Sequence, residues 1–246
     1  MAYTNSPLVT YTNLTKNRTD GRKHDIDTIT IHCYVGQVTA KQGCDYFATT
    51  NRQCSSNYVV GVDGSIGLSV EEKNRAWTSG GVDANYNVIR VNGISGADND
   101  HRAVTIEMAC DTTYPYAVTT AAYNALIALV ADICKRNNIK KLMWKGDKTL
   151  VGNISQQNMT VHRWFAPTAC PGDSLYGQMG DIASKVNAKL TAKVEKGADM
   201  VKALVDRYGI EINNRELAIK ALDKAKNDPN YLSLYWIIHK LLNGNN

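Results

Sequence analysis

The sequence predicts an α/β domain built on a central mixed β-sheet flanked by helices, with a small C-terminal module of three helices. Three observations favour this class. Short β-rich runs and a helical run follow one another along the first 190 residues, an order typical of α/β domains. Two of the β-rich runs end in a histidine, at His32 and His162. From about Ala192 onward the sequence becomes charged and helical in pattern.

The composition is that of one catalytic domain with a small appendage. The chain has 246 residues, of which 43% are hydrophobic, enough for a packed core. Its net charge of +5 is modest, and basic and acidic residues are interleaved, as in residues 70–75. A mixed solvated surface is therefore a better interpretation than an anionic partner. No apolar run approaches the roughly 18 residues of a membrane span.

The N-terminus and the cysteines bear on the cellular compartment. The first six residues have no basic start followed by an apolar stretch, so we expect no secretory signal. Six cysteines in a chain of this length do not form a disulfide scaffold. We expect most of them to be buried thiols, and Cys170 to be the exception.

The first half of the chain contains four predicted strands. Residues 1–25 are polar, and we expect them to wrap the domain as an irregular arm. Residues 27–32 form a β-rich run that leads directly into His32. Residues 58–66 read as a strand, an Asp-Gly turn and a second strand. Residues 103–109 form a further strand.

The second half contains a helix and one more strand. Thr119 or Thr120 can cap the helix, which ends around residues 135–138, where cations and asparagines suit a C-terminus. Its apolar residues fall on one face at helical spacing: Ala122, Leu126, Leu129, Val130 and Ile133. Residues 159–162 form a short strand that ends in His162.

The tail has a different organisation. Three amphipathic stripes, near residues 201–208, 217–225 and 232–242, predict three short helices. Asn213 with Glu216 resembles a capping box, and Asp228-Pro229 is a strong helix start. The predicted domains are therefore a catalytic domain at 1–190 and a helical module at 195–246.

The sharpest chemical signal lies between His162 and Gly172. A histidine at a strand end is followed eight positions later by Cys170 in a Cys-Pro-Gly sequence. Zinc favours mixed nitrogen and sulfur ligands, and a catalytic site uses three of them with a fourth position open. His32, at another strand end, fits as the third ligand. Each residue alone would more often be structural, but together they predict a zinc site.

At this point the chain resembles the type-2 N-acetylmuramoyl-L-alanine amidases, which include phage lysins and peptidoglycan-recognition proteins. The resemblance covers roughly residues 25–190, and its matching segments are residues 30–32, 57–66, 75–77, 104–107 and 162–172. It implies a zinc ion held by His32, His162 and Cys170. It also implies hydrolysis of the amide bond between N-acetylmuramic acid and L-alanine in peptidoglycan.

Glu107 is the candidate general base and acid. It is the only acid in its apolar strand, and a buried carboxylate is costly unless it is paired or used. Some family members use a tyrosine seven positions before the turn aspartate instead. That position here, counted back from Asp63, is Ser56, so the resemblance implies the glutamate type. The alternative is a solvent-facing Glu107 on an edge strand.

Other positions depart from the family pattern. Thr168 stands where many members have lysine, and either its hydroxyl donates to the oxyanion or it shapes the loop. Trp77 and Asn57 are the candidate substrate-binding residues, although Trp77 could also be a core residue. Relatives often have Trp-His-Ala-Gly where this chain has Trp-Thr-Ser-Gly at 77–80.

The remaining histidines are not expected to bind metal. We expect His24 and His101 to lie on the surface or behind the ligands, because neither ends a strand in a matched motif. His239 lies on an apolar helical stripe of the tail and is expected to be structural.

Two functional alternatives to the zinc hydrolase remain. A non-catalytic peptidoglycan-binding protein of the same fold is the main one, but such relatives typically lack the cysteine ligand that Cys170 provides. Nucleic-acid binding by the tail has weak support, since its net charge is only +2. The tail either binds the cell wall, associates copies of the chain or merely stabilises the domain. An endolysin or autolysin that stays in the cytoplasm until it is released to the wall fits the missing signal.

Overall fold

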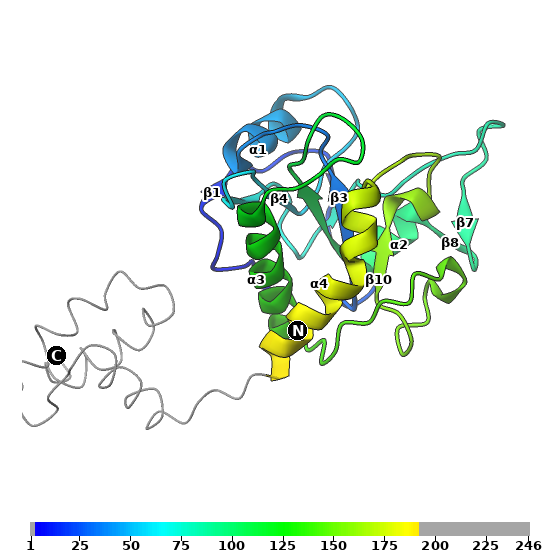
Figure 1. Ribbon diagram of the computed structural model, residues 1–246. Helices are drawn as coiled ribbons and strands as arrows, with labels where there is room; N and C mark the ends of the chain where they lie inside the picture. The colour runs from blue at the N-terminus through cyan, green and yellow to red at the C-terminus, as the bar shows by residue number, and fades with distance from the viewer. Residues whose placement is uncertain (1–2, 192–246) are drawn as a thin grey trace, which may run out of the picture. The chain divides into compact units, whose positions relative to one another are not determined.

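The computed structural model describes residues 3–191 (Figure 1). Its helices are α1 (Ala40–Thr49), α2 (Gly96–Arg102), α3 (Thr120–Arg136) and α4 (Asp173–Thr191), with 3₁₀ helices η1 (Lys148–Leu150) and η2 (His162–Trp164). The three expected tail helices and His239 lie outside the described residues. The division into domains at 1–190 and 195–246 stays a prediction. No helix among residues 3–191 combines the length and apolarity needed to cross a membrane.

A six-stranded mixed sheet forms the centre of the domain, as predicted. The strand order is β1 (Tyr11–Thr12), β5 (Ile66–Leu68), β4 (Tyr58–Val60), β9 (Ala103–Met108), β3 (Thr28–Cys33) and β10 (Met159–Val161). All neighbouring strands are parallel except β4 and β5, which form the expected hairpin. Two small antiparallel pairs complete the structure: β2 (Arg18–Thr19) with β6 (Arg75–Ala76), and β7 (Arg90–Val91) with β8 (Ile94–Ser95).

The two faces of the central sheet have different chemistry. Along β9, Val104 and Ile106 point to one face and Thr105 to the other, because side chains alternate along a strand. The first face joins α3 and α4 in the main apolar core (Figure 1). The opposite face carries polar groups, and Asn99 of α2 donates a 3.0 Å hydrogen bond to Thr30 of β3. The sheet is therefore buried on both sides, with a polar layer under one of them.

Helix α3 forms where the apolar periodicity predicts it. Thr119 is its N-cap and accepts a hydrogen bond from the backbone N–H of Ala122. Helices α1, α2 and α4 were not predicted. Helix α1 has a weak apolar stripe, since it buries only Ala40, Gly43, Cys44 and Phe47, although a capping box of Thr39 and Gln42 marks its start.

The N-terminal segment is more regular than expected. Residues 1–25 were predicted to be irregular, but they contain β1 and β2. Strand β1 adds to the edge of the sheet by pairing with Gly67 and Leu68 of β5, and β2 pairs with β6. Each strand has two residues, too few to show a β pattern in the sequence.

His101 is buried in α2, so of the two places expected for it, the surface and the region behind the ligands, the surface is excluded. Its Nδ1 accepts a hydrogen bond from the backbone N–H of Lys23. Burial, together with the nearby cations Arg75, Lys23 and Arg22, lowers the pKa of His101 from 6.5 to about 4. His24, by contrast, is exposed.

This burial predicts acid sensitivity. In the unfolded chain His101 is protonated below about pH 6.5, whereas in the folded chain it stays neutral down to about pH 4. Protonation of His101 therefore does not lower the free energy of unfolding above pH 6.5, but it lowers that free energy progressively as the pH falls towards 4. We expect the free energy of unfolding to fall less between pH 7 and pH 5 in His101→Gln than in wild type, by about 2 kcal/mol. Urea denaturation of both metal-free proteins checks this, and equal losses would contradict it.

Candidate metal centre

Three parallel strands place three site residues in one row. His32 pairs in register with Glu107 across β3 and β9. Val161 pairs with Ile31 across β10 and β3, so His162 follows β10 at the level of His32. Parallel strands in register point paired side chains to the same face, about 4.8 Å apart. The carboxyl ends of β10, β3 and β9 therefore present His162, His32 and Glu107 side by side on the polar face.

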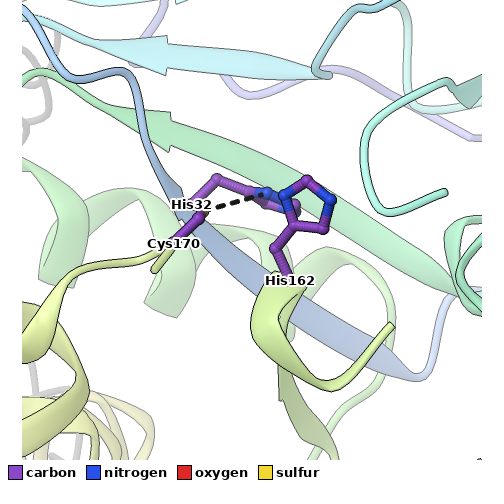
Figure 2. Close-up of side chains that lie close together, drawn as sticks. All are labelled: His32, His162 and Cys170. Carbon is purple, nitrogen blue, oxygen red and sulfur yellow. Dashed lines mark hydrogen bonds between the residues drawn. The ribbon is translucent and has the colours of Figure 1, made fainter. Parts of the chain in front are cut away.

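Cys170 joins the two histidines from the loop between η2 and α4. One ligand atom of each residue, His32, His162 and Cys170, lies within 4.8 Å of the others. The His32 Nδ1 and Cys170 Sγ atoms are 3.6 Å apart, and the two imidazole ring centres are 5.0 Å apart (Figure 2). Two nitrogen donors and one sulfur donor thus converge from three segments and could hold a metal ion.

Two further hydrogen bonds hold these ligands in place. The Oγ atom of Ser79 lies 3.3 Å from Nε2 of His32, the ring nitrogen that faces away from Cys170. The backbone N–H of Cys33 donates to Sγ of Cys170 at 3.3 Å. Asp100 in turn accepts hydrogen bonds from the backbone N–H groups of Thr78 and Ser79. The ligand orientation is therefore set by a surrounding shell of polar contacts.

The electrostatics favour neutral His32. The side chain is fully buried, and burial together with the neighbouring His162 lowers its pKa well below 6.5. A neutral imidazole is the form that binds a metal, so no proton has to be displaced near neutral pH. Nε2 of His162 is buried and has no hydrogen-bond partner among the described residues. A buried polar atom without a partner is unusual and marks a place where a ligand fits.

Glu107 faces a cavity beside the ligands. Strand β9 lies between β3 and β4, so the alternative of an edge-strand, solvent-facing Glu107 is wrong. Burial raises the pKa of Glu107 to about 7, while nearby His162 opposes the shift and Cys110 adds to it. Its Oε2 atom is buried without a partner among the described residues. A carboxyl group with a pKa near neutrality is suited to accepting and returning a proton.

The cavity has a volume of about 770 Å³ and opens onto the candidate centre. Its lining includes Glu107, His162, Cys170, Thr168, Trp77 and Tyr116, and an aromatic wall of Tyr34, Tyr46 and Phe47, whose rings contact one another. Thr168 is exposed, and its hydroxyl oxygen accepts a hydrogen bond from the backbone N–H of Cys170. Trp77 is half-buried, and its indole N–H donates to Thr19.

Asn57 is placed away from this cavity. It is fully buried, and its amide oxygen accepts from Arg22 and from the backbone N–H of Thr105, while its amide nitrogen donates to the carbonyl of Val70. These contacts tie the strand β4 region to its neighbours. We therefore leave Asn57 out of the proposed substrate contacts.

The cysteines fit the expectation of thiols. All six are free, and Cys33, Cys44, Cys110, Cys134 and Cys170 are buried. Only Cys170 belongs to the ligand cluster.

Sequence reasoning did not assign a role to Ser79 or to the aromatic wall. Ser79 lies within the Trp-Thr-Ser-Gly segment, whose departure from the family pattern was visible in the sequence. Ser79 contacts His32 only because the segment after β6 folds back against β3, and no local sequence pattern predicts that arrangement. Tyr46 and Phe47 belong to α1, a helix with a weak sequence signal.

The Ser79 contact carries a prediction. We expect Ser79→Ala to weaken metal binding at this cluster, measured with zinc, about tenfold, because His32 loses the group that orients its ring. Ser69→Ala is the matched control, since Ser69 is also buried but its hydroxyl has no partner among the described residues. Competition with a chromophoric chelator measures both affinities. Equal affinity in the two variants would contradict the role of Ser79.

Comparisons with known proteins found solved structures of similar fold. Among solved structures, PlyL is similar at 16% identity, with a TM-score of 0.50 over 73% of this chain and 97% of that one. AmpD is also similar, at 18% identity with a TM-score of 0.48 over 74% of this chain and 99% of that one. The amidase LysC from Clostridium intestinale is similar at 16% identity, with a TM-score of 0.48 over 74% of this chain and 99% of that one. The comparison with curated proteins gave no match.

The family comparison covers more than half of the chain. A model of the N-acetylmuramoyl-L-alanine amidase family matches residues 22–173, a segment that begins before β3 and ends at the start of α4. It contains His32, Glu107, His162 and Cys170. The chain therefore belongs to the N-acetylmuramoyl-L-alanine amidase family, the peptidoglycan amidases.

Proposed function

We propose that His32, His162 and Cys170 hold a zinc ion at which the chain hydrolyses the bond between N-acetylmuramic acid and L-alanine. The donor set of two nitrogens and one sulfur is one that zinc prefers. In a tetrahedral zinc site, nitrogen and sulfur ligands lie about 3.5 Å apart, given Zn–N and Zn–S lengths near 2.0 and 2.3 Å. The 3.6 Å between His32 Nδ1 and Cys170 Sγ matches this spacing. The unpartnered Nε2 of His162 is a second sign of fit.

Glu107 and Thr168 have separate roles in the proposed hydrolysis. Zinc, when bound, supplies Lewis-acid polarisation of the amide carbonyl and acidifies water. Glu107, one strand away from His32, accepts the proton of the attacking water and then returns it to the leaving amine. Thr168 has a hydroxyl hydrogen free to donate to the developing oxyanion, because its oxygen is the acceptor in the bond from Cys170.

The cavity walls suit the substrate of this family. Trp77 and the aromatic wall offer flat apolar faces, which pack against sugar rings and aliphatic parts of a stem peptide. The single observation that carries the proposal is the alignment of His162, His32 and Glu107 on adjacent strands, with Cys170 closing the ligand set.

Digestion of purified peptidoglycan tests the proposed reaction. We expect new free L-alanine amino groups without new reducing sugars. New reducing sugars alone would identify a glycosidase and overturn the proposal. Sedimentation with the wall in the absence of any new ends would instead identify a non-catalytic binding protein.

Thr168 gives a further prediction. We expect Thr168→Val to lower kcat about a hundredfold, since an oxyanion donor is lost, while Thr168→Ser retains most activity. Zinc affinity, measured alongside, separates this role from loop shaping. A Val variant that loses zinc as well as turnover would show that Thr168 only positions Cys170.

The tail from 195 to 246 is proposed to bind the cell wall or to associate copies of the chain. The proposed setting is an endolysin or autolysin that reaches the wall by lysis. Deletion of residues 195–246 followed by separate measurements of wall pelleting, activity and mass in solution tests the tail. Unchanged pelleting would remove the targeting role, and an unchanged mass would remove the association.

A further inference from the structure

A projecting arm between β6 and β7 carries exposed apolar side chains. The arm consists of residues 81–89, between β6 and β7, and this segment extends away from the body of the domain (Figure 1). Val82 and Val88 pair across it as an antiparallel bridge and are 40% and 54% exposed. Tyr86, at the tip, is 87% exposed, the most of any large hydrophobic residue between 3 and 191. This group of exposed apolar side chains on one projecting segment is a candidate interaction surface.

The tip of the arm is held in a defined shape. The Asp83 carboxylate accepts hydrogen bonds from the backbone N–H groups of Asn85 and Asn87 and from the side-chain amide of Asn87. The backbone of Asp83 also exchanges hydrogen bonds with Tyr86 and Asn87. Tyr86 has a φ of 63°, a conformation that bulky residues rarely adopt. The turn therefore presents the Tyr86 ring to solvent at a conformational cost.

The base of the arm is anchored to the metal-binding region. A Cβ atom on Gly81 would lie 2.4 Å from Cβ of Ala166 and 2.5 Å from the carbonyl oxygen of Phe165, so the arm packs directly on the loop that follows His162. Ser79, two residues earlier, contacts His32. Five residues of extended chain reach about 17 Å at most, so Tyr86 lies within that distance of Gly81.

We propose that this arm binds the glycan strand of polymeric peptidoglycan beyond the sugar whose amide is cleaved. The inference rests on the proposed function. The exposed Tyr86 ring offers a flat face for a sugar ring, and the exposed Asn85 next to it in the chain offers an amide for the N-acetyl and hydroxyl substituents. Residues 81–89 contain no lysine or arginine, so the arm lacks the groups that would recognise the carboxylates of a stem peptide.

Tyr86→Asn is the informative variant, because asparagine tolerates positive φ and lacks the ring. Tyr86→Phe keeps the ring, and Leu8→Asn removes an exposed apolar side chain elsewhere. Binding to insoluble peptidoglycan is measured by sedimentation in a Glu107→Gln background, so that the wall stays intact. Cleavage by the otherwise native chains is measured on a soluble disaccharide peptide and on the polymer.

We expect Tyr86→Asn to bind the polymer about fivefold more weakly and to keep its kcat/KM on the soluble fragment. Tyr86→Phe and Leu8→Asn should behave as wild type in both measurements. Soluble oligomers of N-acetylglucosamine should displace the wild-type arm from the polymer but have little effect on Tyr86→Asn.

Three results would overturn the inference. The first is unchanged polymer binding in Tyr86→Asn. The second is an equal loss of kcat/KM on the soluble fragment and on the polymer in that variant. The third is a lower mass in solution for Tyr86→Asn than for wild type, which would show that Tyr86 joins two copies of the chain. Failure of the proposed function looks different, because wild type would then leave the soluble fragment uncut.

Discussion

Glu107→Gln is expected to retain bound zinc and to lose turnover by about a thousandfold, within the range typical of a lost general base. The change keeps the size and one hydrogen-bonding oxygen of the side chain but removes its capacity to accept a proton. Because Glu107 is not one of the three clustered ligands, the metal content should not change. Kinetics on a soluble muramoyl peptide and elemental analysis of the same sample check both halves of the prediction.

A matched control is Glu71→Gln, at a partly exposed glutamate that pairs with Lys73 and does not line the cavity. It should match wild type in kcat and in zinc content. Turnover in Glu107→Gln within a few-fold of wild type would remove Glu107 from the chemistry. Loss of zinc in that variant would make Glu107 a ligand.

Cys170→Ala should act on the metal itself. Removing the only sulfur donor of the cluster leaves two imidazoles, so we expect zinc affinity to fall by more than about 100-fold, beyond the effect of losing an orienting group. Activity should then depend on added zinc. Added zinc should also raise the melting temperature of Cys170→Ala less than that of wild type, because the stabilisation by a bound ligand depends on the ratio of its free concentration to its dissociation constant.

Cys54→Ala is the control, because Cys54 is another free cysteine that lines the same cavity but lies outside the cluster. Its zinc affinity and zinc-dependent melting temperature should equal those of wild type. If Cys170→Ala bound zinc as tightly as Cys54→Ala, the proposed ligand set would be wrong.

The sequence predicted the strands of the site because their signals are local. Each of the two histidines follows a β-rich run, and the alternation around Glu107 marks a strand. The Asp-Gly turn at residues 63 and 64 identified the β4–β5 hairpin, which the structure confirms. These patterns depend on neighbouring residues only, so they could be seen without knowing how the chain folds back on itself.

Other features depend on contacts between distant segments. Ser79 meets His32 across 47 residues, and the backbone of Cys33 meets Cys170 across 137. The order of β9 between β3 and β4, which excluded an exposed Glu107, is likewise a property of the whole sheet. No periodicity encodes such pairings, and the sequence left two positions open for His101 for the same reason.

The alignment of His162, His32 and Glu107 also limits how this chain can change by insertion or deletion. A single residue added within β3 before His32 would advance every later side chain by one position and turn the imidazole into the apolar layer under α3. Ile31 would then occupy the place between the other two groups. Length changes inside these strands should therefore abolish catalysis even where the fold survives, whereas changes in the arm at 81–89 leave the spacing of the three groups intact.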